Sequence, residues 1–368
     1  MKQKIEKKNK ILCGKDYDFF YDYTQNKIFF MKDGNITFIE TLKSYTNYSK
    51  IKKIKNGNKH ILILYENGIL LYFNFDEHIG TNLFLKNLGE INKINKFKVC
   101  PIRKIYCGEN FSLILFENEM LYYLEHNTQN TLKKFNTNLQ KNEKICKIYT
   151  SSISSNIFIK TKINENYKYY GMGYNNFNQL GIYNYIDYYY CLTHIPSFDK
   201  FDIKHIYTIN NRTIILLNNN DILGLGLADE FILSLYSNDE DTRHIKKIPI
   251  SSYIKDGSYV IDITHSLGTI YFLMSNNKIY VVGKGMFGEH GDGYNSELNL
   301  EIKEINFFSN NLKNNNENKI IKIKSNYLYT FVMLENKNVY KIGGNKEMMI
   351  LKGNEYNKNL LPKKIEFL

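Results

Sequence analysis

The sequence predicts an all-β protein assembled from repeated units, and three observations lead to this prediction. A pair of apolar strands joined by an Asn-rich turn recurs along the chain, and the turn falls at a fixed offset from the start of the unit. No long stretch shows sustained helical periodicity. Repeats of this size, made of short strands, are typical of β-propellers, in which each unit forms one blade.

Each unit opens with an isoleucine in its first strand. The seven opening isoleucines are Ile11, Ile54, Ile105, Ile148, Ile206, Ile263 and Ile323. Successive openings are separated by 43 to 60 residues, and the clearest copies are those that begin at Ile54 and Ile105. Seven openings predict seven units in one chain.

Asparagine marks the turn inside the unit. Thirteen residues after the opening isoleucine stand Asn67, Asn118, Asn219, Asn276 and Asn336. Asn and Gly tolerate the positive φ that a tight hairpin turn demands, so we expect these residues to adopt it. The chain is rich in Asn throughout, but five matches in one register are hard to obtain by chance.

Glycine marks the end of the strand that follows the turn. Gly226, Gly283 and Gly343 lie twenty residues after their opening isoleucines, and Gly173 takes the equivalent place in the longer fourth unit. A glycine here allows the chain to leave the strand sharply or to approach another backbone closely.

These glycines belong to a pattern that resembles a known family. The segment from Tyr169 to Gly181 resembles the signature of the regulator of chromosome condensation (RCC1-type) repeat, Val-Tyr-x-Trp-Gly-x-Asn-x-x-Gly-Gln-Leu-Gly. The residues that match it are Gly173, Asn175, Gln179, Leu180 and Gly181, whereas Met172 and Asn178 replace its Trp and a Gly. Partial matches elsewhere are Gly226, Gly283, Gly288, Gly291, Gly343 and Asn345.

A second element of this family is an apolar strand followed by Gly-x-x-His-Ser, which resembles the segments that begin at Gly57 and Gly108. The resemblance covers nearly the whole chain, although units one to three have lost most of the glycine signature. It implies a seven-bladed β-propeller. We expect a basic N-terminal tail over residues 1–10 and one propeller domain over residues 11–368. We also expect the C-terminal strand, within residues 361–368, to close the ring by completing the first blade.

Charge and cysteine content restrict the class of protein. Lys and Arg number 49 against 37 Asp and Glu, giving a net charge of +12, yet only three arginines occur. No apolar run is long enough to span a membrane, and the lysine-rich start of the sequence leads us to expect no secretory signal. The five cysteines show no CxxC spacing, so we expect reduced, mostly buried thiols in an intracellular protein, nuclear or cytoplasmic.

Motifs that would carry chemistry are weak. Gly283 to Gly288 spells G-x-G-x-x-G, but further glycines follow it where a dinucleotide site needs a helix, so we interpret it as a structural loop. We interpret His60 as a core residue. We interpret the acidic run at 239–241 as a solvated loop, and a cation-binding site is the alternative. The sequence predicts no catalytic residues, no cofactor and no metal site.

We therefore expect a non-enzymatic protein-interaction scaffold or regulatory module that binds partners through a propeller face. The candidate surface is a tyrosine cluster, Tyr183, Tyr185, Tyr188, Tyr189 and Tyr190. Codon bias is an equally good explanation for the local excess of tyrosine. The family resemblance implies a second hypothesis, a guanine-nucleotide exchange factor for a Ran-like small GTPase associated with chromatin. Because lysine carries almost all of the positive charge, contact with nucleic acid or a nucleosome is expected to be weak.

Overall fold

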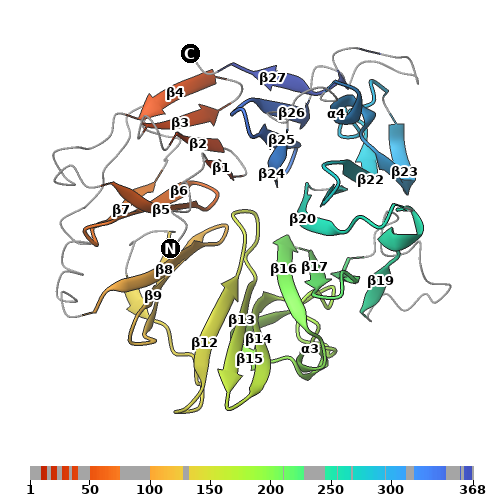
Figure 1. Ribbon diagram of the computed structural model, residues 1–368. Helices are drawn as coiled ribbons and strands as arrows, with labels where there is room; N and C mark the ends of the chain where they lie inside the picture. Colours follow the sequence, from red (N-terminus) through yellow and green to blue (C-terminus); the bar gives the residue numbers. More distant parts are fainter. Residues whose placement is uncertain are drawn as a thin grey trace, which may run out of the picture. The chain divides into compact units, whose positions relative to one another are not determined.

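The computed structural model shows seven antiparallel β-sheets that follow one another along the chain (Figure 1). We call these sheets blades 1 to 7 in chain order, and they confirm the predicted all-β, seven-bladed propeller. The chain divides into two compact units, residues 1–170 and 171–368. The structure describes residues 10–14, 18–22, 27–32, 35–39, 50–74, 100–126, 132–209, 211–227, 245–254, 256–266, 268–294, 296–311, 319–344, 357 and 360–366.

The first three blades lie in the first unit. Blade 1 contains β1 (Lys10–Cys13), β2 (Asp18–Asp22), β3 (Lys27–Lys32) and β4 (Asn35–Ile39). Blade 2 contains β5 (Ile51–Asn56), β6 (His60–Tyr65) and β7 (Leu70–Asn74), and the residues after β7, 75–99, lie outside the described part. Blade 3 contains β8 (Ile102–Cys107), β9 (Phe111–Phe116), β10 (Leu121–Glu125) and β11 (Leu132–Lys134).

The division between the units falls within a strand of blade 4. Blade 4 contains β12 (Lys144–Tyr149), β13 (Ile157–Ile163), β14 (Asn166–Tyr174) and β15 (Tyr188–His194), followed by α3 (Pro196–Asp199). Blade 5 contains β16 (Ile203–Ile209), β17 (Arg212–Leu217), β18 (Ile222–Gly226) and β19 (Lys246–Ile248), followed by the short 3-10 helix η4 (Ile250–Ser252).

The last two blades complete the second unit. Blade 6 contains β20 (Val260–His265), β21 (Thr269–Met274), β22 (Ile279–Gly285) and β23 (Ser296–Glu304), followed by α4 (Asn306–Asn311). Blade 7 contains β24 (Ile320–Ser325), β25 (Tyr329–Leu334), β26 (Val339–Gly343) and β27 (Lys363–Ile365). No helix among the described residues is long and apolar enough to cross a membrane.

Every predicted opening isoleucine lies in the first strand of a blade, and all seven are buried. The connections that follow the third strand of a blade contain further strands. They hold the outermost strands of four blades, β11, β15, β19 and β23. Most of these strands carry charged residues and lack an apolar repeat, because only one of their edges is paired and part of each side chain stays in solvent.

The first strands share a β-bulge, which explains their unusual apolar spacing. In blades 2 to 7 the register with the second strand shifts between two residues that lie three and one positions before the opening isoleucine. A regular strand would place residues three apart on opposite faces. The extra residue of the bulge restores the alternation, so that both apolar residues of the Ile-x-x-Ile pattern are buried, as Ile51 and Ile54 are.

The turn asparagines act in a different way from the one we predicted. Their side-chain oxygens accept hydrogen bonds of 3.0–3.2 Å from the backbone N–H two residues further on, which makes them Asx turns. The positive φ, between 66° and 86°, belongs to the residue after each asparagine. These residues are Gly68, Glu119, Asn220, Asn277 and Lys337. Asparagine therefore recurs at this position because of its side-chain hydrogen bond. It does not itself adopt the positive φ, which belongs to the residue that follows it.

Apolar residues on both faces of the second strand form the core between adjacent blades. In β21, Ile270 and Phe272 pack into a cluster shared with blade 5, whereas Tyr271 and Leu273 pack into a cluster shared with blade 7. In the first unit, equivalent clusters join blades 1 and 2 and blades 2 and 3. Because both faces are covered, these strands read as continuous apolar runs such as His-Ile-Leu-Ile-Leu-Tyr in β6.

The C-terminal strand corrects one prediction. β27 pairs with β26 of blade 7, with Val339 opposite Ile365, and does not complete blade 1. Blade 1 takes all four of its strands from residues 10–39, in chain order. The three connections within blade 1 are short, so each of its strands pairs with the one that precedes it, and β4 occupies the place that β27 was expected to fill.

The cysteines also differ from expectation in their exposure. All five are free thiols, but only Cys13 and Cys107 are buried, while Cys146 and Cys191 are exposed. Burial raises the pKa of the Cys107 thiol to about 12, although its Sγ lies 3.4 Å from the Ser112 hydroxyl. The two cysteines that precede glycine therefore serve packing, as their matching sequence contexts indicate.

Candidate interaction surface

The loop between β14 and β15 is organised by one buried side chain, that of Asn175. Its Nδ2 donates to the carbonyl of Ile182 over 2.8 Å, and its Oδ1 accepts from the backbone N–H of Leu180 over 3.1 Å. Its own backbone N–H donates to Asp187 O over 2.7 Å. A single amide thus holds both ends of the loop, which explains why the signature requires Asn here.

The base of the loop packs tightly under this amide. Leu180 and Phe198 of α3 are fully buried, and a Cβ on Gly181 would lie 2.6 Å from the Phe198 ring. Gly181 has φ +75°, and Asn178, which replaces a signature glycine, has φ +57°. Asn is the residue that best tolerates this conformation after Gly, so the departure from the signature preserves the backbone.

Tyrosines project from this rigid base into solvent. Tyr185 is 97% exposed, and Tyr190, on β15, is 83% exposed. Tyr188 packs edge-on against Tyr174 with ring centroids 4.9 Å apart, and its centroid lies 4.6 Å from that of Tyr190. We call Tyr174, Tyr183, Tyr185, Tyr188 and Tyr190 the tyrosine surface.

Two predicted members of the cluster behave differently from the rest. Tyr189 is 9% exposed, because successive side chains of β15 point to opposite faces and Tyr188 and Tyr190 take the outer one. Its inclusion in an exposed surface is therefore wrong. Tyr183 is 41% exposed, but burial of its hydroxyl raises its pKa to about 12. Sequence reasoning missed Tyr174. The available signal was the alternation of side chains at the end of β14, which turns Tyr174 outward because its neighbour Asn175 is buried.

The strand that carries these rings differs from four other outermost strands and shares its lack of charged residues with β4 of blade 1. β11, β19 and β27 each carry two lysines, and β23 carries Glu301, Lys303 and Glu304. Charges on an outer strand discourage pairing with another chain. β15 has the sequence Tyr-Tyr-Tyr-Cys-Leu-Thr-His, with no Asp, Glu, Lys or Arg. Its outer edge therefore lacks the charges that would repel a partner strand.

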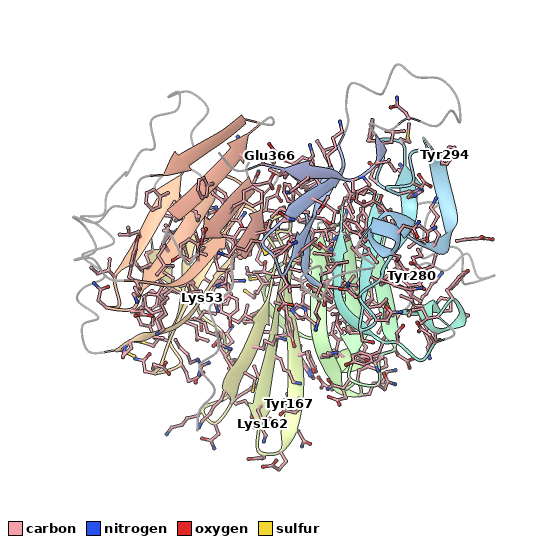
Figure 2. The ribbon with its side chains drawn as sticks, turned by 45° about the horizontal axis from the view of Figure 1, so that its top comes forward. Lys53, Lys162, Tyr167, Tyr280, Tyr294 and Glu366 are labelled. Carbon is pink, nitrogen blue, oxygen red and sulfur yellow. The ribbon has the colours of Figure 1, made fainter. Side chains whose placement is uncertain are left out.

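Exposed tyrosines also occur outside this surface. Tyr294, 46% exposed, precedes β23, and Tyr167, 44% exposed, lies on the β13–β14 hairpin (Figure 2). Lys160 Nζ lies 3.8 Å from the Tyr167 ring centroid, so a local cation–π contact already engages that ring. Within the tyrosine surface, ring-to-ring contacts join Tyr174, Tyr188 and Tyr190.

The signature glycines occupy places where a side chain would not fit. Gly226 and Gly283 have φ +105° and +117°, and a Cβ on either would lie 2.1–2.2 Å from a backbone oxygen. A Cβ on Gly57 or Gly108 would overlap the ring of the aromatic residue three positions later. Positive φ values are also found at Gly173, Gly288, Gly291 and Gly343. Asn345 lies outside the described residues.

Blade 6 repeats the blade 4 loop with one change of charge. Phe177 N–H donates to Gln179 Oε1 over 2.9 Å, and Phe287 N–H donates to Glu289 Oε2 over 2.7 Å. The glycines of the G-x-G-x-x-G motif build this loop, and the next element along the described chain is the strand β23 rather than the helix that a dinucleotide site needs. Burial raises the pKa of Glu289 to about 7.

Three of the described histidines are buried in the core, namely His60, His265 and His290. His60 is 1% exposed, with Nε2 3.0 Å from the Ser112 hydroxyl, and burial lowers its pKa well below the ordinary value. His290 Nε2 lies 2.8 Å from the carbonyl of Gly283. No group of three or more metal-ligating side chains occurs among the residues that the structure describes. The acidic run at 239–241 lies outside them.

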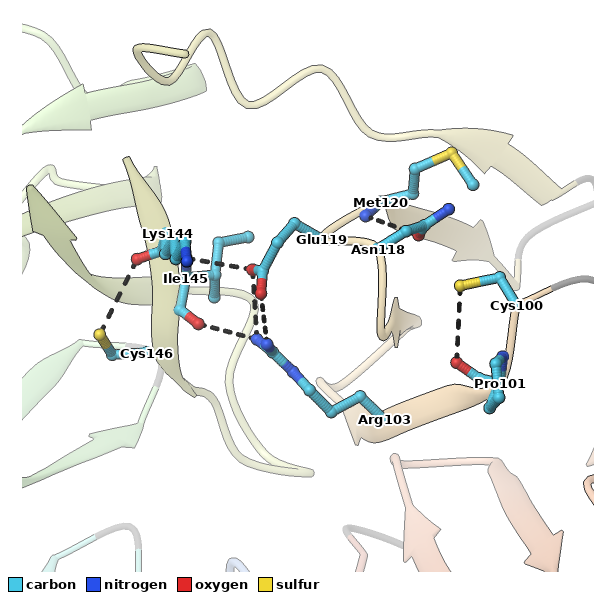
Figure 3. Close-up of polar contacts among 9 residues, drawn as sticks. All are labelled: Cys100, Pro101, Arg103, Asn118, Glu119, Met120, Lys144, Ile145 and Cys146. Atoms are coloured by element: carbon cyan, nitrogen blue, oxygen red, sulfur yellow. Dashed lines mark hydrogen bonds and ion pairs between the residues drawn. The ribbon is translucent and has the colours of Figure 1, made fainter. Parts of the chain in front are cut away.

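The two described arginines are bound within the protein. Arg103 forms an ion pair with Glu119 and donates to the carbonyl of Ile145 over 2.7 Å (Figure 3). Arg212 is 7% exposed and donates to a backbone carbonyl over 3.1 Å. The third, Arg243, lies outside the described residues. Neither described guanidinium is thus offered to an acidic partner.

Comparison with known proteins finds this fold in solved β-propeller structures. No family model matches the sequence, and no curated protein matches it. The crystal structure of human WBSCR16 is similar with a TM-score of 0.62 at 11% identity, covering 88% of this chain and 85% of that one.

Two structures of the Saccharomyces cerevisiae protein Prp20 are also similar. Prp20p, studied with its binding to Gsp1p and histones, gives a TM-score of 0.61 at 15% identity over 86% of this chain and 77% of that one. Yeast RCC1 (Prp20) bound to Kap60 gives 0.64 at 14% identity over 100% and 90%. At these identities the likeness shows the fold alone.

Proposed function

We propose that this chain is a non-enzymatic protein-interaction module that binds a partner through the tyrosine surface of blade 4. The observation that carries the proposal is the grouping of exposed, mutually packed tyrosines along a strand without charged residues. Tyrosine contributes apolar area and a hydroxyl with little loss of side-chain freedom, which favours it in binding sites. The loop beneath is held by Asn175, so little ordering is needed on binding.

The test compares proteins that co-purify with three forms of the full chain. The wild type is set beside Tyr185→Ser/Tyr190→Ser, which removes the two most exposed rings of the surface. The control is Tyr253→Ser/Tyr294→Ser, which removes two exposed rings elsewhere in the second unit. We expect at least one partner to be lost from the first variant and kept by the control. Identical partners in all three forms would contradict the proposal, provided that the unfolding midpoints agree.

The similar structures indicate which partners to test first. Prp20p is described with binding to Gsp1p and histones, so a Ran-like GTPase and nucleosomes are the first partners to offer. We infer no exchange activity, since no contact among the described residues favours it over binding alone. Release of fluorescent GDP from the GTPase decides the matter, because acceleration by the wild-type chain would replace our proposal with an exchange factor. Nuclear or cytoplasmic location stays a prediction that microscopy of the tagged protein can test.

A further inference from the structure

A row of lysines occupies one repeated position in the first unit. The position is the residue just before the opening isoleucine, and in blades 2 to 4 it is where the first strand resumes its register after the bulge. Blades 1 to 4 all have lysine there, and these residues, Lys10, Lys53, Lys104 and Lys147, are what we call the lysine row. Four independent strands thus supply the same side chain at the same height.

The strands that carry the row lie side by side. β1 contacts β5, and β5 contacts β8. The loops at their ends are joined by backbone hydrogen bonds of 2.9 Å, from Asn58 N–H to Glu109 O and from Glu109 N–H to Ser154 O. Arg103 of β8 bonds to the Ile145 carbonyl of β12 (Figure 3). The four strands that carry the row are therefore neighbours in space.

The ammonium groups of the row repel one another. All four lysines are half-buried, and Lys53 is labelled on its strand in Figure 2. Burial lowers the pKa of Lys53, and the charges of Lys10 and Lys104 lower it further. Burial also lowers the pKa of Lys147, together with the charges of Lys104 and Lys160. Each of these influences disfavours the charged form of a lysine. The lowered pKa values of Lys53 and Lys147 therefore reflect burial together with positive charges held close to one another.

The second unit treats the same position differently. It holds His205, Asp262 and Lys322 in blades 5 to 7. Asp262 forms an ion pair with Lys322 over 2.5 Å and accepts from the Tyr207 hydroxyl over 3.2 Å. By contrast, neither Lys53 nor Lys104 forms an ion pair with any other described residue. A purely structural role would be expected to place a balancing carboxylate beside Lys53 and Lys104 as well.

We propose that the lysine row is a binding site for a compact, polyphosphorylated small molecule. Lysine acts as a point charge toward phosphate, and one phosphate monoester brings close to two negative charges and three acceptor oxygens. A ligand with several such groups can neutralise four neighbouring ammoniums at once. Because the lysines are half-buried, a small anion reaches them where the backbone of a nucleic-acid duplex would not.

The experiment uses isothermal titration calorimetry of the full chain with inositol hexakisphosphate as the probe. Sulfate at matched ionic strength serves as the reference anion. The test variant is Lys53→Gln/Lys104→Gln, which removes two charges of the row but keeps polar side chains of similar length. The control is Lys133→Gln/Lys134→Gln, which removes the same charge from exposed lysines of β11 in the same unit.

We expect saturable binding of the probe by the wild type and none of sulfate. The row variant should bind about 100-fold more weakly, at about tenfold for each lost contact, and the control within about twofold of the wild type. Without ligand, the row variant should also unfold at a higher urea concentration than the wild type, because repulsion is relieved. If the double variant does not fold, Lys104→Gln alone should show the tenfold loss.

Three results would overturn the proposal. One is the absence of saturable probe binding by the wild type. Another is an equal loss in the control, which would mean that net charge alone attracts the anion. The third is that the wild-type chain does not bind the probe but does bind a polyglutamate peptide, and that the row variant binds this peptide more weakly. This site is independent of the tyrosine surface, so either proposal can fail alone.

Discussion

The buried carboxyl of Glu289 should make this protein less stable in mild alkali than near pH 5. Glu289 is 6% exposed and stands where blade 4 has Gln179. Both accept a hydrogen bond from the backbone N–H two residues earlier. Glu289→Gln would therefore keep the loop while removing the charge.

The magnitude follows from the pKa of about 7, raised from the ordinary 4.5 by burial. The folded chain holds this proton between those two values whereas the unfolded chain releases it, so stability falls as pH rises from 4.5 to 7. The full loss above pH 7 is about 3 kcal/mol. The new amide lacks the Asn176 partner that Gln179 has, which costs about 1 kcal/mol at every pH. The net gain at pH 8 should be about 2 kcal/mol.

Urea unfolding at pH 5, 7 and 8 provides the assay. The quantity to compare is the change in the substitution's effect between pH 5 and pH 8, which should be about 3 kcal/mol. The reciprocal change Gln179→Glu in blade 4 is the matched control and should introduce a similar loss above neutral pH. An effect of Glu289→Gln that is the same at all three pH values would refute the reasoning.

Three further predictions concern backbone and charge. Gly283→Ala should cost about 3 kcal/mol or more, because its Cβ meets a backbone oxygen, whereas Gly68→Ala, also at positive φ but with open space around it, should cost about 1 kcal/mol; equal urea midpoints would contradict this. Lys337→Gly should raise the urea midpoint by an equivalent of about 0.5–1 kcal/mol, since Lys337 has φ +71°, and a lower midpoint would count against the turn assignment. Burial lowers the pKa of His290 to about 4, so stability should fall as pH drops from 6.5 to 4, and His290→Leu should flatten that part of the urea-midpoint profile.

Much of the fold was predictable because the first strand of every blade meets the same packing requirement. Each opening isoleucine must fit between two blades, so its type and spacing survive in the sequence, and all seven assignments are confirmed. The outermost strands escaped prediction because they are paired on one edge only. β27 was placed in blade 1 because its Pro-x-x-Ile pattern carries no information about which sheet it joins.

The candidate surface was predictable only in part. An excess of tyrosine indicated the region, but the inward turn of Tyr189 depends on strand alternation that begins at Tyr188. The lysine row was missed for a different reason. Its members stand one residue before each opening isoleucine, yet a bulge must be known before that position can be assigned to a common side of the strand. In a lysine-rich chain, proximity is what distinguishes these four lysines from the others.

The bulge allows one short strand to pack between blades with some of its residues and to present a charged or polar side chain with another. The apolar residues on either side of it are Ile or Val in blades 2 to 7, whereas the residue between them, just before the opening isoleucine, is Lys, His or Asp. Exchanging that residue alters the charge presented by a blade without touching the packing between blades. Ligand preference at this level of the propeller can therefore change by single substitutions, one blade at a time, at little cost in folding.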